Sequence, residues 1–180
     1  MRCVRPGGKV STSTEDLDPG AADVSAVIVL AAGHGTRMKS TTSKLLHKVA
    51  GKSMLSYAVQ AAKALSPQHL VVVVGHGREQ VQAHLGEIAP EATIAVQEEQ
   101  LGTGHAVRCG LGALPPQVRG TVVVTYADVP LLSGETLGEL VRTHARQANA
   151  VTVLTAELDD PTGYGRIVRD HGRVLRIVEH

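Results

Sequence analysis

A glycine-containing turn followed by two cations is the first feature of the sequence that could do chemistry. Residues 30–38 read Leu-Ala-Ala-Gly-His-Gly-Thr-Arg-Met, and Lys44 follows them. Gly33 and Gly35 let the backbone approach a ligand closely, and successive N–H groups in such a turn can bind an anion. Arg37 offers a planar fork of donors for phosphate oxygens, while Lys44 offers a mobile point charge. The pattern predicts a phosphate-binding turn, with a tight turn carrying surface cations as the alternative.

Two common phosphate-binding fingerprints do not fit this part of the chain. The dinucleotide-binding fingerprint requires a glycine where Met38 stands, and the P-loop fingerprint requires one where Leu46 stands. The segment is therefore either a phosphate loop of another kind or no phosphate loop.

An aspartate that follows an apolar run is the second feature. Residues 122–127 read Val-Val-Val-Thr-Tyr-Ala, and Asp128 comes next. Mg²⁺ in proteins is usually held by one or two carboxylates together with substrate phosphates and waters. Asp is also a common turn residue, so the sequence leaves two interpretations open. Asp128 either holds a magnesium ion or caps the turn at Val129 and Pro130.

A polar segment at residues 97–105 is the third feature, with the sequence Gln-Glu-Glu-Gln-Leu-Gly-Thr-Gly-His. The Gln97 amide can accept a hydrogen bond from N3–H of uracil while donating to O4. It could also flip to suit cytosine, so a fixed backbone N–H, for which Gly102 is the candidate, is needed to select uracil. The alternative is a polar loop in which Thr103 caps the next helix.

Apolar strands that alternate with amphipathic helices are expected to position these segments. Buried strands are predicted at 24–30, 70–74, 92–96, 121–125 and 150–156, helices at 53–65, 78–85, 103–114 and 134–148, and a hairpin at 165–178. The alternation predicts an α/β fold with a doubly wound, mostly parallel, Rossmann-like sheet, which binds ligands at the carboxyl ends of its strands. Residues 1–23 are expected to be a disordered extension, and residues 24–180 a domain that is incomplete at its C-terminus.

The composition excludes several other classes of protein. The 180 residues are 43% hydrophobic and 19% charged, which is typical of a soluble globular domain. A net charge of +1 provides no basic field for nucleic acid or a membrane, and three tyrosines without Trp or Phe leave few surfaces for stacking bases. Two cysteines, Cys3 and Cys109, are too few for a disulfide framework. We expect a cytoplasmic protein without a nucleic-acid or membrane partner. None of the nine histidines, His34 and His105 included, is assigned a chemical role.

Taken together, the segments resemble those of the nucleoside-diphosphate-sugar pyrophosphorylases. The resemblance rests on the turn with residues 44–47 and 51–55, on residues 97–107 and on residues 159–168, in that order and spacing. From about residue 24 to residue 180 the chain is similar to the N-terminal uridylyltransferase domain of the bifunctional bacterial enzymes of the GlmU family. This resemblance implies that UTP and N-acetylglucosamine 1-phosphate react, with Mg²⁺ as cofactor, to give pyrophosphate and UDP-N-acetylglucosamine, a cell-wall precursor. Two alternatives are a transferase for another sugar 1-phosphate and a fragment that binds UTP or a UDP-sugar without catalysis.

The resemblance also implies roles for individual residues. The catalytic positions are Arg37, Lys44 and Asp128, with Asp128 as the Mg²⁺ ligand. The nucleotide-binding positions are Leu30, Ala31, Ala32, Gly33, Gln97, Gln100, Gly102, Thr103, Tyr126 and Ala127. The sugar-binding positions are Gly165 and Glu179.

Three departures from the family pattern stand out. The family usually has glycine where this chain has Ala127, and the Ala127 Cβ would crowd the nucleotide if φ were positive. Ser43 stands where proline is frequent, so that loop is expected to be less rigid. A sugar-binding Asn, a second Mg²⁺-binding Asn and a trimerising β-helix domain lie beyond His180 in the family. The resemblance therefore implies impaired transfer and weak or no oligomerisation for this chain.

Overall fold

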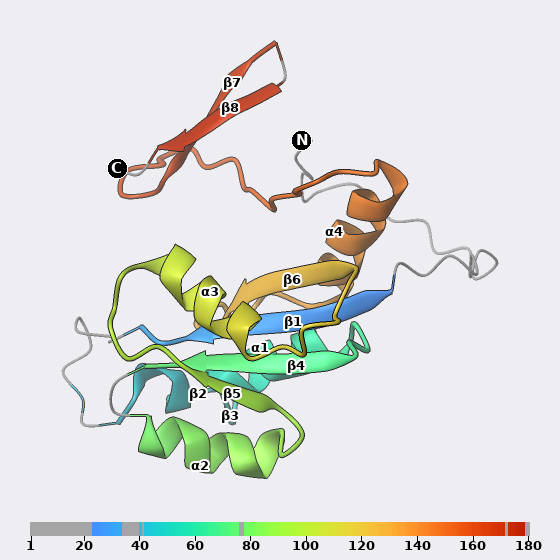
Figure 1. The fold of residues 1–180 in the computed structure, drawn as a ribbon. Helices are drawn as coiled ribbons and strands as arrows, with labels where there is room; N and C mark the ends of the chain where they lie inside the picture. Colours follow the sequence, from blue (N-terminus) through green and yellow to red (C-terminus); the bar gives the residue numbers. More distant parts are fainter. Residues whose placement is uncertain (1–22, 34–39, 41, 76–77, 172, 179–180) are drawn as a thin grey trace, which may run out of the picture. The chain divides into compact units, whose positions relative to one another are not determined.

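The computed structural model describes residues 23–33, 40, 42–75, 78–171 and 173–178 (Figure 1). The predicted N-terminal extension lies outside these residues except for Asp23. The chain divides into two compact units, one over Asp23–Gly138 and one that begins at Glu139. No helix in the described part of the chain is long and apolar enough to cross a membrane.

A four-stranded parallel sheet forms the centre of the first unit, with the strand order β5-β4-β1-β6. The strands are β1 (Val24–Ala31), β4 (His69–Val74), β5 (Thr93–Val96) and β6 (Thr121–Tyr126). The register runs from Ala26↔His69 to Ala31↔Val74 between β1 and β4, and ends at Leu30↔Tyr126 between β1 and β6. β1 and β4 are almost wholly buried, as their continuous Val- and Ile-rich sequences predict for central strands of a parallel sheet.

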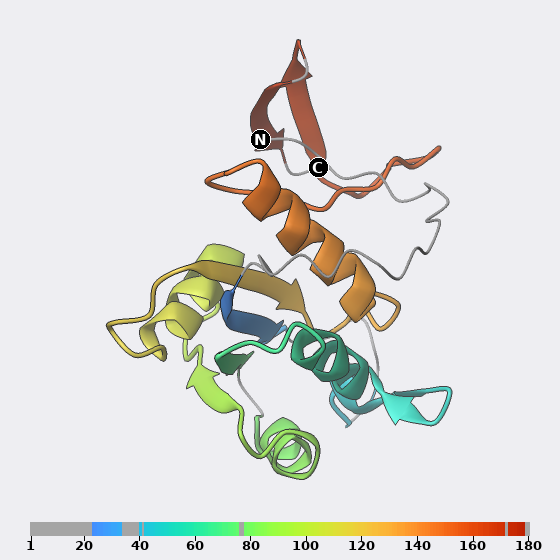
Figure 2. The same ribbon diagram turned by 90° about the vertical axis from the view of Figure 1, so that its right-hand side faces the viewer.

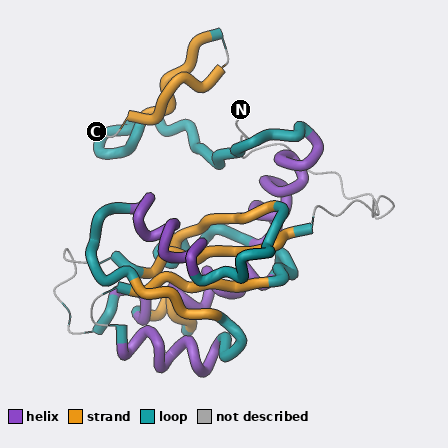
Figure 3. The backbone as a smooth tube through the Cα atoms, in the orientation of Figure 1, coloured by secondary structure: helices purple, strands orange, loops and turns teal. Residues whose placement is uncertain are grey.

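Helices cover both faces of this sheet, so the predicted α/β fold class is confirmed. The helices are α1 (Met54–Lys63), α2 (Glu79–Ile88), α3 (Thr103–Gly112) and the short 3₁₀ helix η1 (Lys44–Leu46). Figure 2 shows α1 and α3 on opposite faces, and Figure 3 shows helices alternating with strands along the first unit. The chain moves outward from β1 to β4 and β5, and then returns through α3 to β6 on the other side of β1. The strand order therefore reverses between β1 and β6, where sheets of this kind open a crevice for ligands.

Local sequence signals explain two of the helices that pack on the sheet. Ser53 precedes α1 and accepts a hydrogen bond from the Ser56 N–H at 3.0 Å, which is the N-cap predicted from the sequence. On α3, a Cβ built on Gly110 would lie 2.6 Å from Cγ2 of Ile28 on β1. Glycine at this position lets α3 pack closely against the sheet, so the loop before α3 is held near the strand ends.

The remaining elements lie at the end of the chain. α4 (Gly134–Arg146) begins in the first unit, and its residues from Glu139 onward belong to the second. The second unit also contains β7 (Arg166–Asp170) and β8 (Arg173–Val178), which form the predicted antiparallel hairpin. His171 in the connecting turn has φ of 43°, a left-handed conformation that single turn residues adopt.

One expectation about the secondary structure was wrong, and one small element was not predicted. Residues 150–156 are not a buried strand, because the segment has only an isolated bridge at Leu154 and its residues are exposed or half-buried. A short apolar run does not fix a strand unless a neighbouring strand pairs with its backbone. Conversely, an unpredicted hairpin joins β2 (Lys48–Val49) to β3 (Lys52–Ser53). Its turn residues, Ala50 and Gly51, both have positive φ, and only the glycine signals such a turn.

Candidate nucleotide-binding site

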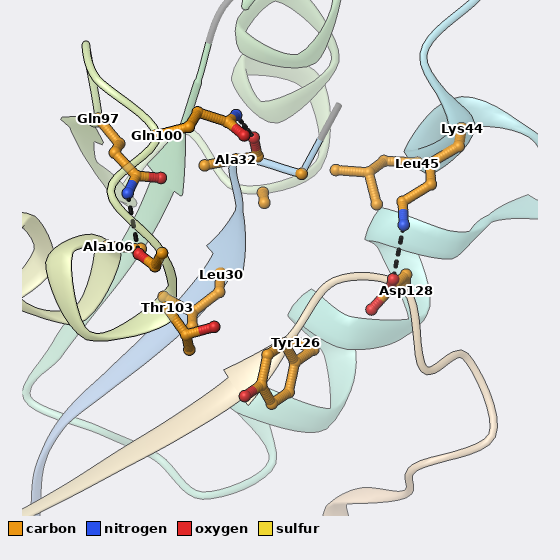
Figure 4. Close-up of a pocket in the computed structure, with 13 residues that line it drawn as sticks. Leu30, Ala32, Lys44, Leu45, Gln97, Gln100, Thr103, Ala106, Tyr126 and Asp128 are labelled. Carbon is orange, nitrogen blue, oxygen red and sulfur yellow. Dashed lines mark hydrogen bonds and ion pairs between the residues drawn. The ribbon is translucent and has the colours of Figure 1, made fainter. Parts of the chain in front are cut away.

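A cavity of about 240 Å³ lies at the carboxyl ends of β1 and β6, within the first unit (Figure 4). Its lining comes from the end of β1, from η1, from the loop between β5 and α3, from the first turn of α3, and from the end of β6. The lining residues are Leu30, Ala31, Ala32, Gly33, Lys44, Leu45, Gln97, Gln100, Gly102, Thr103, Ala106, Tyr126 and Asp128. The structure therefore brings together the three segments that the sequence singled out.

Four positions of the predicted set are not part of this lining. Arg37 and Glu179 lie outside the described residues. Gly165 belongs to the second unit. Ala127 is fully buried, and its N–H donates to the Leu30 carbonyl at 3.0 Å. Because Ala127 is not among the described residues with positive φ, alanine fits here without backbone strain.

An ion pair occupies one end of the pocket. Lys44 Nζ lies 2.6 Å from Oδ2 of Asp128, and the two side chains are 24% and 41% exposed (Figure 4). A Cβ on Gly33 would lie 4.0 Å from the same ammonium, so the glycine turn borders the pair directly. The Asp128 carboxylate thus contacts a lysine 84 residues away in the chain, which a cap on the following turn does not explain. Both groups keep access to solvent, so each can exchange its partner for an ion or a phosphate.

A buried amide occupies the other end of the pocket. Gln97 is 3% exposed, and its Nε2 donates to the Gly102 carbonyl at 3.1 Å. Gly102 has φ of 87° and is the N-cap residue of α3, a conformation that favours glycine. Thr103 is the first residue of α3 and lines the pocket, so the alternative in which Thr103 caps this helix is wrong.

One side chain joins the two ends. Gln100 Nε2 donates to the carbonyl of Ala32, which connects the loop before α3 to the turn after β1 (Figure 4). Gly75 at the end of β4 makes room for this contact. A Cβ there would lie 2.7 Å from the Ala32 carbonyl oxygen and 3.2 Å from Gln100 Nε2. Gly75 directly follows the strand predicted at residues 70–74, and the sequence does not reveal this role because the approach of distant backbone leaves no local signal.

Asp128 is the carboxylate of this pocket that could hold a metal ion. Among the described residues, no three His, Cys, Asp or Glu side chains cluster as a complete metal site. Mg²⁺ does not require one, since it usually combines one or two carboxylates with substrate phosphates and waters. The half-exposed carboxylate of Asp128, next to Gly33 and Lys44, fits that donor set.

Comparison with known proteins agrees with this geometry. Residues 27–176 match the family model of the MobA-like NTP transferase domain, so the chain belongs to this family of nucleotidyltransferases. The chain is 66% identical over 157 residues to the bifunctional protein GlmU of Cutibacterium acnes, a match that covers 87% of this chain and 37% of the relative. The corresponding protein of Streptomyces avermitilis is 62% identical over 157 residues, covering 86% and 33%. The chain spans about a third of the length of these relatives.

A solved structure shows the same fold at lower identity. The chain superposes on a putative glucose-1-phosphate thymidylyltransferase from Bacillus anthracis with a TM-score of 0.72. The two are 23% identical, and the match covers 87% of this chain and 64% of the other. At that identity the likeness supports the fold alone.

Proposed function

We propose that this chain transfers the uridylyl group of UTP to N-acetylglucosamine 1-phosphate, giving UDP-N-acetylglucosamine and pyrophosphate. The observation that carries the proposal is the Lys44–Asp128 pair beside the glycine turn, in one pocket with the buried Gln97 amide. The relatives named GlmU favour this choice of nucleotide and sugar.

The two ends of the pocket divide the nucleotide between them. We place the uracil against Gln97, Gly102 and Thr103, and the triphosphate against Gly33 and Lys44. The Gln97 Oε1 would accept from N3–H of uracil. Arg37 is a second cation for the phosphates in this proposal. Gly165 and Glu179 are proposed to contact the sugar nucleotide.

The transfer itself needs no protein nucleophile. A phosphate oxygen of the sugar phosphate attacks the α-phosphorus of UTP in line, a new P–O bond forms, and the bond to the β-phosphate oxygen breaks as pyrophosphate leaves. Both reactants are anions, so the protein must neutralise charge and align the groups. Lys44 would move from Asp128 to the β- and γ-phosphates and stabilise the charge that develops on pyrophosphate.

Mg²⁺ is the proposed cofactor, and Asp128 is its proposed protein ligand. When bound, the ion would screen the repulsion between the two phosphorylated reactants. The exchange is balanced in charge, because Lys44 gains phosphate oxygens when Asp128 gains the cation.

A pyrophosphate-release assay with a substrate panel tests this function. UTP with N-acetylglucosamine 1-phosphate should give Mg²⁺-dependent release above that from other sugar 1-phosphates and other nucleotides. Pyrophosphate release with a different nucleotide and sugar 1-phosphate would mean that the chain catalyses another sugar-nucleotide transfer. Tight UTP binding by calorimetry without release would mean that this chain binds the nucleotide but does not catalyse transfer.

A further inference from the structure

His105, in the first turn of α3, contacts the loop that carries the buried amide. Its Nδ1 lies 2.9 Å from the carbonyl oxygen of Glu99, and its Nε2 lies 3.7 Å from Sγ of Cys109. A carbonyl oxygen can only accept a hydrogen bond, so Nδ1 carries a proton and donates it to Glu99. In the neutral ring, Nε2 is then free to accept from the Cys109 thiol. One tautomer of His105 therefore satisfies Glu99 and Cys109. In this tautomer the Gln97 Nε2, 3.2 Å from Nδ1, is a neighbour and not a hydrogen-bond partner, because both nitrogens carry protons.

The loop held by His105 is also closed by its own backbone. The Leu101 N–H donates to the Glu99 carbonyl at 2.9 Å, and the Ala106 N–H donates to the Gly102 carbonyl at 3.2 Å. The Glu99 carbonyl thus accepts from Leu101 and His105, and the Gly102 carbonyl accepts from Ala106 and Gln97. A carbonyl oxygen has two lone pairs, so both groups are fully used. The path of the chain from Glu99 to Gly102 is fixed at both ends.

The same loop sets the orientation of the Gln97 amide. Its Nε2 lies 3.1 Å from the Gly102 carbonyl oxygen and 3.2 Å from His105 Nδ1. In a flipped amide, Oε1 would face the Gly102 oxygen, and two acceptors would meet without a proton between them. The His105 proton, which is donated to Glu99, would offer the flipped oxygen only a shared hydrogen bond at 3.2 Å. Figure 4 shows the amide nitrogen turned toward this bond and the oxygen turned away from it.

We infer that His105 is a positioning residue for base selection. By donating to Glu99 it keeps the Gly102 carbonyl against the Gln97 nitrogen, and Oε1 of Gln97 is left to face the base. That acceptor suits a pyrimidine whose ring nitrogen N3 carries a proton, as in uracil. It repels cytosine, whose N3 is itself an acceptor. The inference rests on the proposed function, in which the pocket binds UTP.

Burial of the Gln97 amide strengthens the discrimination between uracil and cytosine. Gln97 is 3% exposed, so water cannot relieve a mismatched pair at its amide. Sites that leave a buried polar group unpaired reject the wrong ligand much more strongly than apolar pockets do. In this inference the fixed group that orients the Gln97 amide is the Gly102 carbonyl, beside the backbone N–H that is expected from the sequence to select uracil.

Two substitutions of His105 by amide side chains distinguish a role in base selection from a role in the stability of α3. His105→Asn keeps an amide donor near the place of Nδ1, whereas His105→Gln moves its amide toward the place of Nε2 and leaves Glu99 without this donor. His105→Leu is a second variant that lacks the donor, and Cys109→Ala is a control that removes only the partner of Nε2. Thermal unfolding of each variant establishes that it is folded.

The readout is the ratio of the dissociation constants for CTP and UTP, measured by calorimetry with Mg²⁺. We expect the wild-type chain to prefer UTP, and His105→Gln and His105→Leu to lower the preference by about tenfold, the effect of one buried hydrogen bond. His105→Asn and Cys109→Ala should keep the preference within about twofold, because the donor to Glu99 remains.

Three results would overturn the inference while leaving the proposed function intact. These are an unchanged preference in the folded donor-free variants, an equal loss of affinity for UTP and CTP, and a loss of preference in His105→Asn that matches the loss in His105→Gln. A wild-type chain without preference for UTP would instead contradict the proposed function, and the inference with it.

Discussion

The two ends of the pocket are built on opposite principles. At one end, Lys44 and Asp128 form a half-exposed ion pair whose members can separate when an ion or a phosphate arrives. At the other end, the Gln97 amide is buried, and the Gly102 carbonyl fixes which of its atoms faces the cavity. The charged end is therefore suited to exchanging ionic partners, and the amide end is suited to recognising the hydrogen-bonding pattern of a base. The charged end can change partners during a reaction, while the amide end has one arrangement before any ligand binds.

The largest expected effect is at the charged end. Lys44→Ala should lower kcat for pyrophosphate release by about 10²–10³-fold, because it removes a charge that stabilises the transition state. Lys48→Ala is the matched control, since Lys48 is an exposed lysine in the neighbouring strand β2 and does not line the pocket. Equal kcat values for the Lys44 and Lys48 variants would show that Lys44 does not stabilise the transition state.

The hydrogen bond from Gln100 to Ala32, which connects the two ends of the pocket, should be disturbed by one added methyl group at Gly75. Gly75→Ala places a Cβ 2.7 Å from the Ala32 carbonyl oxygen, so the strand end or the Gln100 contact must shift. We expect a loss of about 1–3 kcal/mol in the free energy of unfolding, together with weaker UTP binding. Denaturant unfolding and calorimetry measure the two effects.

Gly86→Ala provides the control for that substitution. Gly86 is exposed on α2, and a Cβ added there would have nothing within 4 Å of it. Alanine at this position should stabilise the helix by about 0.5–1 kcal/mol. If Gly75→Ala behaved like Gly86→Ala, the close approach of Gln100 and Ala32 would not exist in solution.

A change of salt concentration should affect the charged end of the pocket more than the amide end, and this effect should be smaller than those of the substitutions. Added salt screens exposed charges but acts little on buried hydrogen bonds. Raising the ionic strength from about 0.1 M to about 1 M, which shortens the Debye length from about 10 Å to about 3 Å, should weaken UTP binding several-fold. The ratio of CTP to UTP dissociation constants should stay constant. A ratio that falls together with the affinity would mean that base selection also depends on charge.

The strands and the general location of the site follow from sequence because their signals are local. The Val-rich strands β1 and β4 are buried on both faces, and Ser53 caps α1 as its type suggests. Parallel strands then bring the carboxyl ends of β1 and β6 to one edge, although Lys44 and Asp128 are 84 residues apart in the chain. Periodicity and topology were sufficient for these features.

Other features depend on pairings that no local pattern contains. The turn at Ala50 carries an alanine in a conformation typical of glycine or asparagine, and residues 150–156 are apolar but lack the ladder of a strand. The contact of Gln100 with Ala32 joins residues 68 positions apart through the space left by Gly75. His105 offered no signal, because the partners of an isolated histidine at the start of a predicted helix become known only from the fold.

Calorimetric titration of UTP into the wild-type chain and into Asp128→Asn, each with and without Mg²⁺, tests the central proposal most directly. In the proposed exchange, Asp128 separates from Lys44 and binds the Mg²⁺ ion that contacts the phosphates. Mg²⁺ should therefore tighten UTP binding to the wild-type chain and have no effect on UTP binding to Asp128→Asn. An equal gain from Mg²⁺ in both proteins would show that Asp128 does not hold the ion, and the proposed exchange of partners at this ion pair would be wrong.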